Sequence, residues 1–209
     1  MMEERDAVSP DKPPPEFMSA LVTEHFVLQG TSSSTISESG SRVSIYLSAL
    51  SSGLVAIGFA SGSHRALESL SFTVLPTVFV LGWFTIVRLI DSSVANIVSQ
   101  RRMDQIRGYY ASLHPIAAPY FVAGDPAATN HGVRYGRWSF LYTMASMVSV
   151  VNSVVGGATT ALAFALAVRA TAPLPVIAGI LGGLIVLGLS LHYEHRRITP
   201  MVLQRAEAP

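Results

Sequence analysis

The 209-residue sequence contains no cysteine and very little charge. Without cysteine there is no disulfide, no thiolate metal ligand and no cysteine nucleophile. Only 13% of the residues are Asp, Glu, Lys or Arg, against about 25% in a soluble domain. Half of the residues are hydrophobic and the mean hydropathy is +0.44. Low charge together with long apolar runs indicates an integral membrane protein.

Acidic residues are missing from the centres of the apolar runs, and catalytic motifs are missing from the whole sequence. A proton-coupled carrier usually has an acidic relay inside its spans. There is no P-loop, HExxH or GxSxG motif, so we expect no enzyme activity and no cofactor. His192 and His195 flank Glu194 with no third ligand nearby, which favours a polar belt at a membrane surface over a metal site.

The first 42 residues lack the basic start and apolar core of a signal peptide, and none is expected. We interpret them as a cytosolic segment with a short helix over 16–29. Pro15 suits the first turn of this helix and Gly30 suits its end. The Ser/Thr-rich residues 31–41 are either a linker or the start of the first membrane helix.

Four apolar runs are long enough to cross a bilayer as helices, which takes about 20 residues. They cover residues 43–60, 70–90, 140–168 and 174–193. Because these runs are continuous and do not alternate with polar residues, they predict an all-α fold and exclude a β-barrel. The expected architecture is a four-helix membrane bundle.

The basic residues predict the orientation of the chain. Of the fourteen Lys and Arg residues, only Arg65 and Arg169 fall in the two connections on one side, which leaves twelve on the side of both termini. Basic residues collect on the cytoplasmic side of a membrane. We therefore expect both termini to be cytoplasmic, in a multi-pass protein of the cell (plasma) membrane.

The second span has no residue that would end its helix at the membrane surface. No Gly or Pro lies between Gly82 and Gly108, and apolar residues recur at helical spacing up to Leu113. We expect an amphipathic cytosolic helix over 91–114. Its apolar stripe is expected to pack against a second copy, the 16–29 helix or the lipid headgroups.

Polar segments are expected around the remaining spans. Residues 115–138 are predicted to be a cytosolic loop, and residues 194–209 a cytosolic tail without structure from residue 198. The basic residues of the cytosolic helix favour anionic lipid or an acidic partner. They are Arg101, Arg102 and Arg107.

The third span carries polar residues at steps of three or four, which places them along one face. The central ones are Ser146, Ser149, Asn152, Ser153 and Thr160. One interpretation is a pore or solute path lined by hydroxyls and an amide. The other is a packing seam, since small polar residues let membrane helices approach. Small residues mark further helix-packing positions at Ser48, Ser52, Gly156, Gly179 and Gly183.

The stretch EHFVLQGTSSSTISESGSRVSIYLSALSSGLVAIGFA, residues 24–60, resembles small uncharacterised integral membrane proteins of actinobacteria. The resemblance implies a bacterial membrane protein and no particular site. We expect a non-enzymatic membrane protein that acts through helix association, as a small oligomeric assembly, pore-forming in one version, or as an accessory subunit. The alternative is a small-solute or ion transporter using the polar face of the third span. The expected partners are the lipid bilayer and a second copy or a membrane subunit, with no nucleic acid.

Overall fold

The computed structural model describes residues 13–113, 116, 120–121, 143–168 and 173–206. Over these residues the fold is all-helical and contains no strand. The elements are α1 (Pro15–Phe59), the short 3-10 helix η1 (Ala60–Gly62), α2 (His64–Leu113), α3 (Met144–Val168) and α4 (Leu174–Ala206). All four α-helices are long and apolar enough to cross a membrane. The prediction of an all-α protein with four candidate spans is confirmed.

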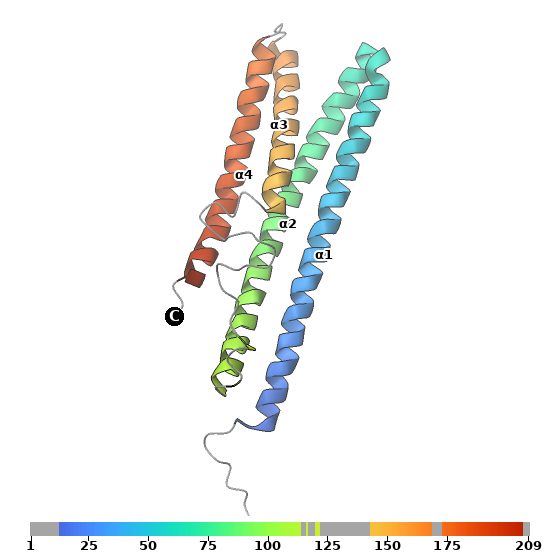
Figure 1. The fold of residues 1–209 in the computed structure, drawn as a ribbon. Coiled ribbons are helices and arrows are strands. Elements are labelled where there is room, and N and C mark those ends of the chain that lie inside the picture. The colour runs from blue at the N-terminus through green and yellow to red at the C-terminus, as the bar shows by residue number, and fades with distance from the viewer. Residues whose placement is uncertain (1–12, 114–115, 117–119, 122–142, 169–172, 207–209) are drawn as a thin grey trace, which may run out of the picture.

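The helices form two antiparallel hairpins, α1/α2 and α3/α4, which meet along α2 (Figure 1). α1 packs on α2 and barely touches α3, and the described residues show no contact between α1 and α4. We call the end where α1 begins and α4 ends the terminal end, and the opposite end the loop end. The hairpins diverge toward the loop end (Figure 1).

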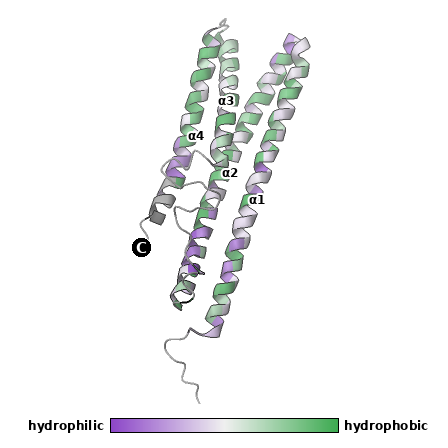
Figure 2. Cartoon of the chain, viewed as in Figure 1, coloured by the Kyte–Doolittle hydropathy of each residue, from purple (hydrophilic) through white to green (hydrophobic). Residues whose placement is uncertain are grey.

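Hydropathy divides the molecule along its long axis. Apolar residues dominate toward the loop end, and polar residues gather toward the terminal end of α1, α2 and α4 (Figure 2). There α1 and α2 extend beyond α3 as a pair (Figure 1). We call residues 15–42 of α1 and residues 91–113 of α2 the stalk.

The predicted end of the first helix at Gly30 is wrong, because α1 continues through residues 31–41 into the first apolar run. Hydroxyl groups along this stretch donate to the carbonyl four residues back, at 2.6 to 2.9 Å, as Thr31, Thr35 and Ser39 do. These side chains therefore follow the helix and do not compete with it. A glycine inside a helix costs about 1 kcal/mol, which packing against α2 offsets.

The second helix continues from its apolar run to Leu113, as the sequence predicts, and contains Pro76 within it. In the stalk, Met103 and Ile106 of α2 are buried against Leu28 of α1. Of the three surfaces expected to cover the apolar stripe, the structure thus shows the 16–29 region. Ser32 donates to Oδ1 of Asn96 at 2.5 Å, and buried polar pairs of this kind fix the register of packed helices.

The fourth helix also runs further than expected, to Ala206, so the prediction of an unstructured tail from residue 198 is wrong. No Gly or Pro interrupts the chain from Leu189 to Thr199, and the side chain of Ile198 is buried. Pro200 lies inside the helix, where it removes one backbone donor and its ring crowds the carbonyl four residues back. Packing of the preceding turn therefore carries the helix past it.

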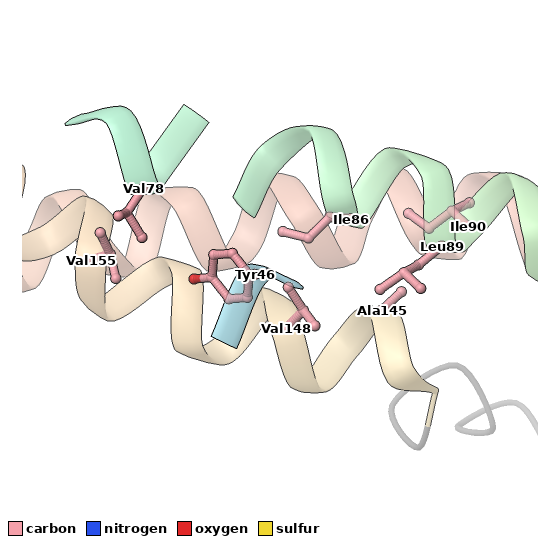
Figure 3. Packing of buried hydrophobic residues seen from close by; sticks show 8 residues of the cluster. All are labelled: Tyr46, Val78, Ile86, Leu89, Ile90, Ala145, Val148 and Val155. Carbon is pink, nitrogen blue, oxygen red and sulfur yellow. The ribbon is translucent and has the colours of Figure 1, made fainter. Parts of the chain in front are cut away.

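The core lies where α2 crosses α3. Leu89 and Ile90 of α2 and Ala145 and Val148 of α3 are almost fully buried there. The ring of Tyr46 reaches in from α1 between the two helices (Figure 3). This crossing joins the two hairpins.

Candidate functional site

The polar face of α3 is buried inside the bundle. Ser149 and Asn152 are fully buried, and Ser146 and Ser153 nearly so. Their serine hydroxyls donate to carbonyls of the same helix, Ser149 to Ala145 at 2.8 Å and Ser153 to Val150 at 2.7 Å. Thr160, the last residue of the predicted face, is exposed and donates to the Gly156 carbonyl at 2.8 Å. The hydroxyls are thus largely satisfied by their own helix.

Asn152 lies at a junction of three helices. Its Oδ1 accepts a hydrogen bond from the Tyr46 hydroxyl of α1 at 3.3 Å. A Cβ added to Gly82 of α2 would lie 2.1 Å from that same Oδ1 and 2.8 Å from the Tyr46 ring. Glycine is therefore required at position 82 for the three helices to meet. The Asn152 Nδ2 group is buried with no hydrogen-bond partner among the described residues.

Glycines let α3 and α4 approach with their backbones in contact. A Cβ added to Gly179 would lie 2.9 Å from the Gly157 carbonyl oxygen, and one added to Gly183 would lie 2.9 Å from the Ser153 carbonyl oxygen. Gly156 lies against both the Phe79 ring of α2 and the Val186 side chain of α4. Gly157 was not among the residues that the sequence singled out, because its partner on α4 is visible only in the fold.

An apolar groove of about 450 Å³ lies over this glycine contact, between α3 and α4. Small residues such as Gly157 and Ala161 line it beside the larger side chains of Ile180 and Leu184. Ser153 is the member of the predicted polar face that lines it. Ser146, Ser149 and Asn152 of that face are buried between the packed helices, whereas Thr160 is exposed.

Ser48 and Ser52 do not pack within the chain. Both are exposed on α1, on the side away from the contact of Tyr46 with α2 and α3. The expected seam at these positions is therefore not a contact between helices of one molecule. Their free surface has to be explained by what surrounds the molecule.

The three stalk arginines do not form one basic surface. Arg102 is exposed and lies beside Glu24 along a groove of about 390 Å³ between α1 and α2. Arg107 pairs with Asp104 at 3.5 Å. Arg101 is half-buried, and two of its guanidinium nitrogens have no hydrogen-bond partner among the described residues. At about 100° per residue the three side chains point in different directions around α2.

A second buried polar cluster lies at the terminal end of the α3/α4 hairpin. Glu194 and Ser190 of α4 are both fully buried. The Thr143 hydroxyl, just before α3, donates to Oε1 of Glu194. Oε2 of Glu194 and Oγ of Ser190 have no hydrogen-bond partner among the described residues. Sequence reasoning assigned Glu194 to an exposed polar belt, because His192 and Arg196 next to it are polar.

Comparison with protein-family models found no match to the chain, and comparisons with curated proteins and with solved structures found none either. The function therefore has to be argued from the geometry of this molecule.

Proposed function

We propose that the protein is a non-enzymatic multi-pass membrane protein that acts by self-association through the outward face of α1. The carrying observation is that this face is inverted relative to its surroundings. In the stalk, outside the spans, it exposes Phe26 at 66% and Ile36 at 54%. Within the first apolar run the same face exposes Ser44 and Ser51 beside Leu47 and Leu54. Large apolar side chains of this face thus lie outside the predicted span, and hydroxyls interrupt its apolar surface within the span.

A second copy of the same helix suits both halves of this face. Val22, Phe26, Gln29, Ser33 and Ile36 are exposed and follow one another at steps of four and three residues. This spacing is that of a coiled-coil seam. Two copies in one membrane have the same orientation, so their α1 helices meet in parallel and such a seam pairs with itself.

The membrane half of the face supports close approach. A Cβ added to Gly40 or Gly58 would have no atom within 4 Å, so the surface is open along this side. Small residues on a membrane helix permit backbone contact between neighbours, and serine hydroxyls bond across such contacts. In this arrangement Ser44 and Ser51 lie between copies, whereas Ser48 and Ser52 lie about 80° and 120° around the helix from the centre of this face.

The orientation that this proposal uses has both termini in the cytoplasm of a plasma membrane, since the basic residues gather at the terminal end. An impermeant thiol reagent tests it directly, because the protein has no native cysteine. Applied outside intact cells, the reagent should label Ser63→Cys, near the loop end, and leave Ser37→Cys in the stalk unlabelled until the cells are lysed. The opposite pattern would overturn the orientation.

Oxidative crosslinking in native membranes tests the association. Ser33→Cys places a single thiol on the outward face, and Thr31→Cys places one two residues away, about 200° around the same helix. Both positions are exposed. We expect disulfide-linked dimers from Ser33→Cys and few from Thr31→Cys, and we expect Phe26→Asp to abolish the Ser33→Cys dimers.

Equal crosslinking at both positions would show random collision, and no crosslinking at either would place association elsewhere. Ion or solute flux from the purified protein in liposomes tests the transporter alternative. Flux that survives Phe26→Asp but is lost in Asn152→Leu would favour a path along α3.

A further inference from the structure

The buried carboxyl of Glu194 has no basic partner in the part of the chain that the structure describes. Among the described residues no Lys, Arg or His forms an ion pair with it, and the nearby Arg197 pairs with Asp91 of α2 at 3.2 Å. α3 contributes no charged residue between Met144 and Val168. A buried carboxylate without a compensating charge is costly. The charge balance of this cluster is therefore incomplete.

The cluster around the Glu194 carboxyl consists of side-chain oxygen atoms. Ser190 and Glu194 are four residues apart on α4, so their side chains lie on one face of the helix. Both are fully buried. Thr143 closes the cluster from the start of α3 through its bond to Oε1 of Glu194. The unsatisfied Oε2 of Glu194 and Oγ of Ser190 leave oxygen lone pairs without a partner in a buried site.

We propose that Glu194, Ser190 and Thr143 form a binding site for a monovalent metal cation, Na⁺ or K⁺. Hard cations take oxygen ligands from carboxylates, hydroxyls and carbonyls. One carboxylate matches a single positive charge, and the described residues hold no group of three His, Cys, Asp or Glu that would suit a divalent or transition metal. The cation neutralises Glu194 and joins the start of α3 to α4.

The site lies where the hairpin meets α2. The described charged and titratable groups around this level of the helices include Asp91 of α2 and His192, Tyr193, His195, Arg196 and Arg197 of α4. Arg197 is engaged with Asp91. Cation binding therefore adds a contact inside the α3/α4 hairpin next to the ion pair that joins α4 to α2.

Thermal unfolding of the purified full-length protein in detergent tests the site without any assumption about association. A ligand that binds only the folded state raises the melting temperature as its concentration rises. At mildly alkaline pH we expect NaCl or KCl to raise the melting temperature relative to N-methylglucamine chloride at the same ionic strength. The comparison of Na⁺ with K⁺ identifies the preferred ion.

Three variants define the ligands. Glu194→Gln should remove the cation dependence, whereas Glu68→Gln, near the start of α2, should retain it as the matched control. Ser190→Ala should shift the midpoint cation concentration upward about tenfold, a usual loss for one supporting group. Thr143→Val should do the same, and these two variants carry the test if Glu194→Gln fails to fold.

Acidification distinguishes the binding of a metal cation by Glu194 from the protonation of Glu194. If the proposal holds, lowering the pH should abolish the effect of Na⁺ or K⁺, because protons compete for Glu194. If the melting temperature responds to pH but never to the metal cation, Glu194 simply holds a proton and the proposal is overturned. A cation effect that persists unchanged in Glu194→Gln overturns it as well.

Discussion

The α3/α4 hairpin packs backbone against backbone, whereas the stalk of α1 and α2 packs side chain against side chain. In α3/α4 a Cβ at Gly157 would lie 2.7 Å from the Gly179 carbonyl oxygen. In the stalk, Leu28 packs on Met103 and Ile106, and Ser32 bonds to Asn96. Lipid supplies no hydrophobic drive between helices, so membrane helices gain by close approach. Outside a bilayer, water supplies that drive.

The largest expected effect comes from forcing a side chain into the glycine contact. Gly179→Leu should lower the free energy of unfolding by upward of about 3 kcal/mol, because its neighbours include backbone atoms that cannot move aside. Gly188→Leu is the matched control on the same helix, where a Cβ meets nothing within 4 Å. It should change stability by less than about 0.5 kcal/mol. Unfolding of the purified protein in mixed micelles measures both, and similar losses would contradict the backbone contact.

The second-largest loss of stability is expected where the two hairpins meet, at Gly82 and Asn152. Gly82→Ala should cost about 2 to 3 kcal/mol, because the added methyl overlaps the Asn152 amide. Removing that amide makes room, so Gly82→Ala with Asn152→Ala should cost less than the sum of the two single changes. Thermal unfolding of all four proteins completes the cycle. Simple additivity would show that the two residues do not meet.

A smaller loss of stability is expected in the stalk, and it should not extend into the rest of α2. Met103→Ala removes a buried side chain from a two-helix contact and should cost about 1 to 2 kcal/mol, below the usual core value. Amide hydrogen exchange should rise over residues 91–113 and remain unchanged over residues 70–90. Gln105→Ala, at an exposed position on the same helix, is the control. A uniform rise along α2 would show that stalk and span unfold as one unit.

The smallest effect concerns a single hydrogen bond. Tyr46→Phe keeps the buried ring and removes the hydroxyl that donates to Asn152. Such bonds inside membrane proteins average about 0.6 kcal/mol, so the loss of stability should be close to that value. A loss above about 2 kcal/mol would mean that Tyr46 holds more than this one contact.

The long apolar runs and the uninterrupted second helix could be read from the sequence because hydropathy and the absence of breakers act locally. The end of the first helix could not, because Gly30 is a good helix end in isolation and only packing against α2 shows that the chain continues. The extension of α4 past Pro200 was missed for the same reason.

The candidate sites also differ in whether the local sequence or the tertiary packing determines them. The steps of three and four in α3 predicted a polar face, but whether it lines a path or packs depends on the residues opposite it. Gly82 is a lone glycine in an apolar run and gives no signal of its own. Glu194 lies next to exposed polar residues in the sequence, and its burial follows from the approach of Thr143 at the start of α3.

The antiparallel stalk has a consequence for synthesis of the chain. Asn96 is made 64 residues after its partner Ser32. At about 5 to 20 residues per second, Ser32 is therefore synthesised roughly 3 to 13 s before Asn96. During that interval the face of α1 that packs against α2 has no partner helix. Ser32 and Thr35 place hydroxyl groups on this face, so the nascent chain exposes less apolar surface there until α2 has been synthesised.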